Sequence, residues 1–222
     1  MKAPGSFLDL DAHRGVFEVK YPRAHKYWDV SGAVVARVER ELPGLSCQAL
    51  GDLGFRFSPF APLGVAMAAF YWDRVLLEPN LETDQTVFQE TCGRFWTIVR
   101  ESFEVEKVSR LGNRYAYRFA GNEKPDQHLK RLGLWRAESS MVPFGDPMNE
   151  DLVLRFENEA IDRRIRLELG TSTRAERGTE RGVVIMDIDF TPIKPVSPDF
   201  DAVDFMGVNL SFLKTNLHQI LR

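Results

Sequence analysis

The chain has 222 residues, a length that a single domain can reach, and 44% of them are hydrophobic, which is enough for a sizeable core. Its formal net charge of −3 argues against a general nucleic-acid binder, because such domains are typically basic. The two cysteines, Cys47 and Cys92, lie far apart without a C-x-x-C pair, so the sequence indicates neither a zinc cage nor a disulfide framework.

No segment of the sequence indicates export or membrane insertion. The stretch MKAPGSFLDLDAHRG has no apolar run long enough for a signal peptide, and no stretch approaches the ~18 uninterrupted apolar residues of a membrane-spanning helix. We therefore expect a soluble, cytoplasmic protein that does not act at a membrane.

The first part of the chain combines strand and helix patterns. Residues 15–21 (GVFEVKY) alternate apolar and polar side chains, as a half-buried strand does. Residues 27–42 carry valines at helical spacing before a Pro-Gly stop. Two or three strands are expected after this helix, one around 48–57 and one over 65–79 with a bend near Trp72 and Asp73.

The clearest helix covers residues 83–103 (TDQTVFQETCGRFWTIVRESF). Apolar residues recur every three or four positions from Phe88 to Phe103, and Thr83 or Asp84 can cap the first turn. This pattern predicts an amphipathic helix that packs on the core.

Strand patterns dominate the second part of the chain. Residues 110–119 combine glycine, asparagine and aromatic residues, which disfavour a helix or favour a strand. Residues 152–159 and 161–169 alternate apolar and polar side chains, and residues 183–190 are predicted to form another strand.

The segments between these strands are polar. A short helical piece is expected around 126–132, a surface loop over 139–151 and a mobile connection over 170–182, which has almost no apolar residues. The chain closes in a long amphipathic helix, whose apolar stripe contains Met206, Leu210, Leu213, Leu217 and Leu221.

Runs of strands separate the helices, a pattern that favours an α+β fold. We predict a largely antiparallel sheet with two or three long amphipathic helices on one face, including the long C-terminal helix. The prediction is one domain over residues 1–222, with sub-lobes of about 1–80 and 81–222 as a finer division.

Arginines recur at every fourth position in the 110–119 strand. As a strand, this segment places Arg110, Arg114 and Arg118 on one face with Gly112 and Ala116, and it places leucine, tyrosine and phenylalanine on the other. The small residues leave space beside the three guanidinium groups.

Neighbouring strands carry further charges on their polar faces, namely Arg164 and Arg166 on one strand and Asp187 and Asp189 on another. The simpler interpretation is that arginines and aspartates pair across strands, which contributes roughly 0.2–1 kcal/mol for each exposed pair. The alternative is a face that binds an anion or a partner, because guanidinium groups grip carboxylate or phosphate in bidentate fashion.

Two short motifs carry a resemblance to a known family. The R-x-G-x-R-Y strand (Arg110, Gly112, Arg114 and Tyr115) and the D-x-D strand (Asp187 and Asp189) before a long helix are similar to motifs of a sporadically distributed family of uncharacterised bacterial and archaeal proteins. The resemblance implies an α+β fold and no established activity.

Motifs of common enzymes are missing from the sequence. It has no G-x-G-x-x-G, no G-x-x-x-x-G-K-[ST] and no G-x-S-x-G, and its four histidines are scattered. We therefore expect no cofactor and no metal, and we assign no catalytic residue.

The leading hypothesis is a non-enzymatic interaction or regulatory protein, in a setting such as bacterial defence, immunity or a mobile element. It rests on the arginine face, on the mobile connection over 170–182 and on the lack of a catalytic motif. Phe205 and Phe212 exceed what one helical stripe requires, which suggests pairing with a protein partner or with a second copy of the chain.

Two alternatives stay open. One is a binding protein or enzyme for an anionic small molecule held between sheet and helices, with Asp187 or Asp189 as the acid or base. The other is nucleic-acid binding through the arginine face together with Arg174, Arg177 and Arg181, which the overall charge disfavours.

Overall fold

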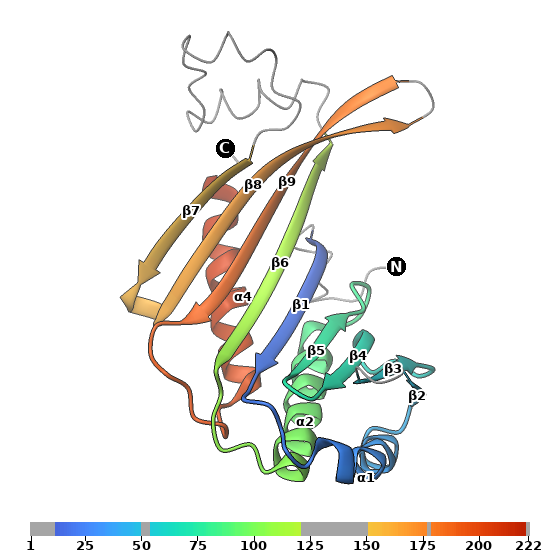
Figure 1. The fold of residues 1–222 in the computed structure, drawn as a ribbon. Helices are drawn as coiled ribbons and strands as arrows, with labels where there is room; N and C mark the ends of the chain where they lie inside the picture. Colours follow the sequence, from blue (N-terminus) through green and yellow to red (C-terminus); the bar gives the residue numbers. More distant parts are fainter. Residues whose placement is uncertain (1–11, 50–53, 121–150, 177–178, 221–222) are drawn as a thin grey trace, which may run out of the picture.

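The structure is a computed structural model that describes residues 12–49, 54–120, 151–176 and 179–220. In this described part, nine strands form one antiparallel sheet in the order β2-β3-β4-β5-β1-β6-β9-β8-β7 (Figure 1). The strands are β1 (Ala12–Lys20), β2 (Leu45–Ala49), β3 (Gly54–Pro59), β4 (Val65–Tyr71), β5 (Arg74–Pro79), β6 (Arg110–Ala120), β7 (Asp151–Asn158), β8 (Arg163–Glu176) and β9 (Thr179–Pro192).

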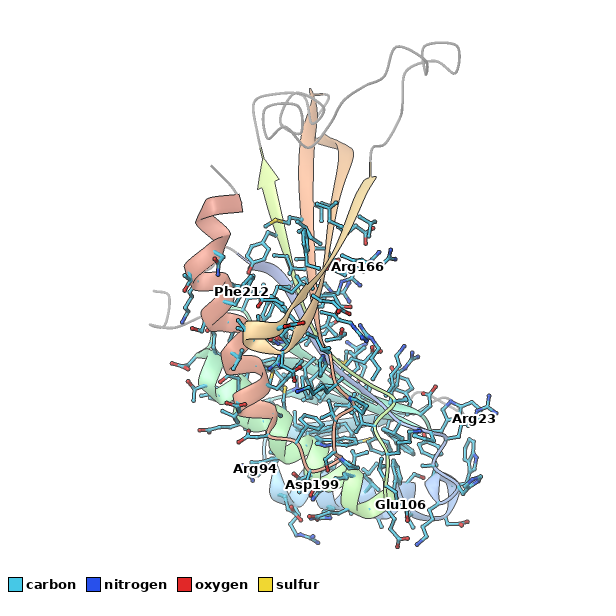
Figure 2. The ribbon with its side chains drawn as sticks, turned by 90° about the vertical axis from the view of Figure 1, so that its left-hand side faces the viewer. Arg23, Arg94, Glu106, Arg166, Asp199 and Phe212 are labelled. Atoms are coloured by element: carbon cyan, nitrogen blue, oxygen red, sulfur yellow. The ribbon has the colours of Figure 1, made fainter. Side chains whose placement is uncertain are left out.

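Among the described residues, three helices pack on one face of the sheet, which confirms the predicted α+β class (Figures 1 and 2). They are α1 (Tyr27–Glu41), α2 (Gln85–Phe103) and the C-terminal α4 (Ala202–Ile220). A short 3-10 turn, η4 (Glu159–Ile161), joins β7 to β8. The predicted cap of α2 is confirmed at Asp84, whose side chain accepts a hydrogen bond from the Thr86 backbone N–H at 2.7 Å.

Aromatic rings of the described residues fill the space between the sheet and the helices. Phe57 of β3 packs edge-on against Phe95 of α2, with ring centroids 5.7 Å apart. Phe70 of β4 contacts Phe103 of α2 at the same centroid distance. Each of these fully buried side chains contributes roughly 1.5–3 kcal/mol through the hydrophobic effect. The face of the sheet toward the helices, which we call the inner face, is therefore the core.

Alternation along the strands sends the polar side chains to the opposite face, which we call the outer face. On β1, Phe17 and Val19 are buried in the core, whereas Glu18 and Lys20 point to the outer face. In Figure 2 the helices lie on one side of the strands and Arg166 lies on the other. None of the described helices covers the outer face.

The segment between α1 and α2 forms more strands than predicted. The strand expected around 48–57 consists of two antiparallel strands, β2 and β3, and the strand expected over 65–79 is the hairpin of β4 and β5. A hairpin with a very short turn preserves the alternation of apolar and polar residues, so the local pattern does not distinguish it from a bend.

The mobile connection predicted over 170–182 is wrong. β8 and β9 continue through this segment as paired strands, with Gly170 opposite Ile185 and Glu176 opposite Thr179. Only residues 177 and 178 lie outside the described part. Strand pairing uses backbone groups, so a polar and threonine-rich segment can pair without apolar side chains.

Three structural predictions remain: a short helix, a loop and a division into two sub-lobes. The short helix around 126–132 and most of the loop over 139–151 fall outside the described residues. The division at residue 80 crosses a continuous sheet, because β1 pairs with β5 on one side and with β6 on the other.

Candidate functional site

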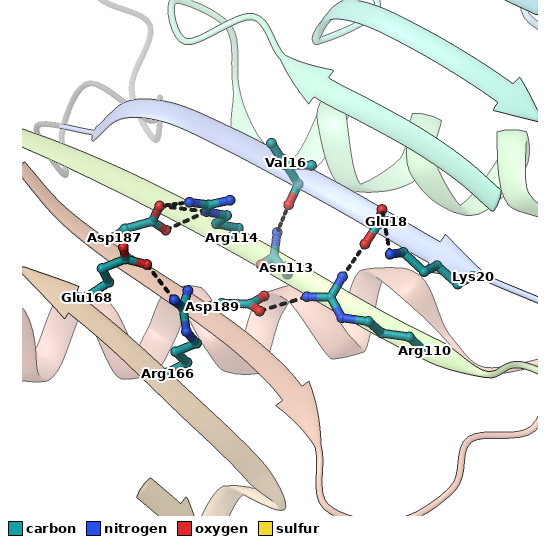
Figure 3. Close-up of polar contacts among 10 residues, drawn as sticks. All are labelled: Val16, Glu18, Lys20, Arg110, Asn113, Arg114, Arg166, Glu168, Asp187 and Asp189. Atoms are coloured by element: carbon teal, nitrogen blue, oxygen red, sulfur yellow. Dashed lines mark hydrogen bonds and ion pairs between the residues drawn. The ribbon is translucent and has the colours of Figure 1, made fainter. Parts of the chain in front are cut away.

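The outer face of β6 carries the first two arginines of the predicted series. Arg110 and Arg114 both point to this face, beside Glu18 of β1 and Asp187 and Asp189 of β9 (Figure 3). The backbone of Arg118 lies in β6 opposite Ile185, but its side chain is outside the described residues. The predicted strand therefore brings at least two of the three arginines to one face.

Arg114 is held by Asp187. Its Nε donates to both carboxylate oxygens at 2.6 Å, and its Nη2 donates to Oδ2 as well. The residue directly opposite Asp187 on β6 is Ala116, so the arginine leans two residues along its own strand to reach the carboxylate. This hydrogen bonding raises the pKa of Arg114 above its usual value.

Arg110, four residues before Arg114 on β6, is also held by carboxylates. It bridges two strands, because its guanidinium donates to Glu18 of β1 and, at 2.7 Å, to Oδ2 of Asp189 on β9. A Cβ built on Gly112 would come within 3.0 to 3.1 Å of this guanidinium. The space that the glycine leaves is thus occupied by the preceding arginine of the same strand.

The arginines predicted on β8 share the outer face. Arg166 lies opposite Asp189 in the register and pairs with Glu168 at 2.6 Å. Arg164 pairs with Glu157 of β7 at 2.8 Å. Arg155 of β7, which was not predicted as a site residue, lies directly opposite Arg166 and extends the positive charge toward the edge of the sheet.

These charges surround a hollow of about 420 Å³ on the outer face, which we call the arginine groove. Its basic lining residues are Arg14, Arg110, Arg114 and Arg166, and its acidic lining residues are Glu18, Asp187 and Asp189. The three carboxylate side chains are between 12% and 16% exposed, whereas the side chains of Arg110, Arg114 and Arg166 are between 34% and 51% exposed. The carboxylates form the floor, and an approaching molecule meets the guanidinium groups first.

Asp189 has an unusual environment at the floor of the groove. Its Oδ2 accepts from Arg110, but its Oδ1 is buried without a hydrogen-bond donor among the described residues. Burial raises the pKa of this carboxyl above its usual value, although Arg110 and Arg114 act in the opposite direction. The protonated form of Asp189 is therefore easier to populate than that of an ordinary surface aspartate.

A second hollow of about 590 Å³ lies at the end of the sheet where β6 begins and β9 ends, and we call it the lysine basin. Its charged lining residues are Lys107, Arg110, Arg164 and Lys194. Sequence reasoning missed the two lysines. They belong to segments that are far apart in sequence, outside the alternating strands, and no local pattern links them.

A buried polar chain connects the strands beneath the groove to α4. Arg163 donates from Nε to Asn209 of α4 at 2.8 Å, Asn209 donates to Asn113 of β6 at 3.4 Å, and Asn113 donates to the Val16 carbonyl at 3.2 Å. Burial lowers the pKa of Arg163. These residues were not predicted, but an asparagine among apolar neighbours in both β6 and α4 is a sequence signal for such a contact.

The two phenylalanines of α4 that suggested a second chain pack within this one. Phe205 is buried, with the Arg163 guanidinium 4.4 Å from its ring centroid. Phe212 packs edge-on against Phe190 of β9, with centroids 5.9 Å apart. Their apolar surface is thus used inside the chain, and it does not by itself indicate a dimer.

The geometry also places the arginines relative to the predicted small-molecule site. They lie on the outer face, so an anion that they hold would not lie between the sheet and the helices.

In the described residues no group of three or more His, Cys, Asp or Glu side chains could hold a metal ion. Within the same residues, no helix is long and apolar enough to span a membrane.

Comparison with known proteins adds no identification. No model of a known protein family matches this chain, and no curated protein matches it either. The resemblance based on the R-x-G-x-R-Y and D-x-D strands stays a prediction.

Proposed function

We propose that this chain is a non-enzymatic interaction protein that binds an acidic segment of a partner protein in the arginine groove. The observation that supports this proposal is the layered arrangement of the groove, with carboxylates that are 12% to 16% exposed beneath more exposed guanidinium groups. Arginine is enriched among the residues that dominate binding energy in protein interfaces.

The buried carboxylates orient the arginines without using all of their donors. A guanidinium group has five N–H donors, and Arg114 directs only Nε and Nη2 toward Asp187. Its remaining donors can bind a second carboxylate from outside. Because the side chain is already held in place, binding loses less rotamer entropy than it would with a free arginine.

The surroundings of the groove suit a protein segment. Leu76 and Ile185 line the groove beside the charges, and Ile185 is exposed although it is a large apolar residue. Mixed apolar and charged surfaces are typical of protein interfaces. The open face of a broad sheet can also accommodate an extended chain.

Binding of a fluorescein-labelled oligoglutamate peptide, followed by fluorescence anisotropy, tests this proposal. Arg166→Ala should weaken binding roughly three- to tenfold, because one half-exposed charged contact is lost. Arg40→Ala is the matched control, since Arg40 is an exposed arginine on α1, away from the groove. It should change the affinity less than about twofold.

Three outcomes would contradict the proposal. Equal affinities of the wild type and Arg166→Ala for the peptide would show that the peptide does not bind in the groove. Free glutamate that binds as tightly as the peptide would favour the small-molecule alternative. An oligonucleotide that binds more tightly than the peptide, with a steep loss of affinity as salt is added, would favour the nucleic-acid alternative.

A further inference from the structure

The lysine basin carries positive charge that the described part of the chain leaves unneutralised. Arg110 and Arg164 are held by carboxylates, but Lys107 and Lys194 form no ion pair within the described residues. Among the described residues, the lining of the basin contains no aspartate or glutamate. This distinguishes it from the arginine groove, where three carboxylates contribute to the lining.

Both lysines are attached to well-anchored backbone. Lys107 precedes Val108, whose side chain is buried, and the N–H of the next residue, Ser109, donates to the Lys20 carbonyl at 2.8 Å. Lys194 lies between Pro192 and Pro195 in the sequence, and proline rings restrict the backbone. The basin therefore brings together two cationic groups that do not depend on long mobile loops.

The remaining lining combines hydroxyl and apolar groups. Ser109 and Thr191 supply hydroxyls, and Val108, Ile193 and Val196 supply apolar surface. The volume, about 590 Å³, exceeds what a bare inorganic anion requires and lies within the range of small-molecule sites. The composition suits a ligand with one strongly charged end and one organic end.

We propose that the lysine basin binds a small phosphate monoester, with Lys107 and Lys194 at the phosphate group and the valine and isoleucine side chains beside the organic part. A phosphate monoester carries up to two negative charges and three acceptor oxygens, so it can satisfy several cationic donors at once. A carboxylate has one charge and two oxygens, so it offers the two lysines less charge and fewer acceptors than a phosphate group does.

This site is separate from the proposed interaction surface, although Arg110 lines both hollows. The experiment therefore uses the two lysines, which do not line the arginine groove. Loss of phosphate binding in lysine variants says nothing about oligoglutamate binding, and the two proposals can fail independently.

Isothermal titration calorimetry with phenyl phosphate at pH ~7.5 tests the proposal, because the second pKa of a phosphate monoester is about 6 and the probe is then largely a dianion. Phenyl sulfate has the same organic part with a single charge, and inorganic phosphate lacks the organic part. We expect phenyl phosphate to bind most tightly. Amide chemical shifts should change at residues 107–111 and at residues 191, 193, 194 and 196 in a ¹H–¹⁵N spectrum.

The variants Lys107→Ala and Lys194→Ala should each weaken binding by about tenfold, as expected for the loss of one hydrogen bond to a charged group. Lys214→Ala is the control, because Lys214 is an exposed lysine of α4 and its substitution removes the same charge outside the basin. Unchanged affinity in both basin variants would overturn the site. Equal affinity for phenyl sulfate would overturn the dianion assignment, and equal affinity for inorganic phosphate would overturn the ester assignment.

Discussion

Removing Arg114 and neutralising Asp187 should have unequal effects on stability, although both changes break the same ion pair. The Asp187 side chain is 12% exposed and the Arg114 side chain is 51% exposed. Arg114→Ala therefore leaves a carboxylate that water reaches poorly, whereas Asp187→Asn leaves a guanidinium that water can solvate.

The expected magnitudes follow from this difference in burial. Stranding a buried charge costs about 3–5 kcal/mol when both partners are buried, and the half-exposed arginine reduces this to about 2–3 kcal/mol for Arg114→Ala. Asp187→Asn should cost about 0.5–1 kcal/mol, as for an exposed pair. For a chain of this size, each kcal/mol lowers the melting temperature by about 2–4 °C.

Urea unfolding of the two single variants and of the double variant measures these free energies. The double variant Arg114→Ala/Asp187→Asn should be more stable than Arg114→Ala alone, because the neutral amide removes the stranded charge. A double-mutant cycle then isolates the coupling between the two side chains. If Asp187→Asn destabilises the chain as much as Arg114→Ala does, the argument from unequal burial is wrong.

Three further predictions concern other parts of the molecule. Gly64 has a φ of +73°, and an added Cβ would lie 2.6 Å from the Phe88 backbone nitrogen. Gly64→Ala should therefore lower the free energy of unfolding by about 2–4 kcal/mol. An unchanged urea midpoint would contradict this prediction. Burial raises the pKa of both thiols, and Cys92 is fully buried. Iodoacetamide should therefore label Cys47 slowly and Cys92 only after denaturation. Mass spectrometry of the native and the unfolded chain measures both reactions. The folded chain binds the Asp189 proton more tightly than the unfolded chain does, so its ionisation should lower stability as the pH rises above the ordinary pKa of 3.8. Urea unfolding over this pH range should show the wild type losing stability relative to Asp189→Asn, and parallel curves would refute the effect.

Most of the regular structure follows from short-range patterns in the sequence. Apolar residues at three- and four-residue spacing predicted α2, whose bounds, Gln85–Phe103, lie within two residues of the expected 83–103. The glycine, asparagine and aromatic residues of 110–119 predicted a strand, and the structure forms β6 over Arg110–Ala120. The prediction failed over residues 170–182, where pairing between backbones forms the β8–β9 hairpin despite polar side chains.

The candidate site was predictable only in part. Alternation placed Arg110, Arg114, Asp187 and Asp189 on the polar faces of their strands, and the structure brings them together. The sequence did not indicate which carboxylate each arginine binds. It also did not indicate that Arg110 extends over Gly112 to reach both β1 and β9.

The local order of residues was sufficient to assign the α+β class, the amphipathic helices and the polar face of β6. These features depend on side chains only a few positions apart, since the periods of helices and strands are short. Tertiary structure alone decided that Arg114 meets Asp187, 73 positions away, and that Lys107 and Lys194 line one basin. Such contacts are set by the order and register of strands in the sheet, and a shift of one residue would send each of these strand side chains to the other face.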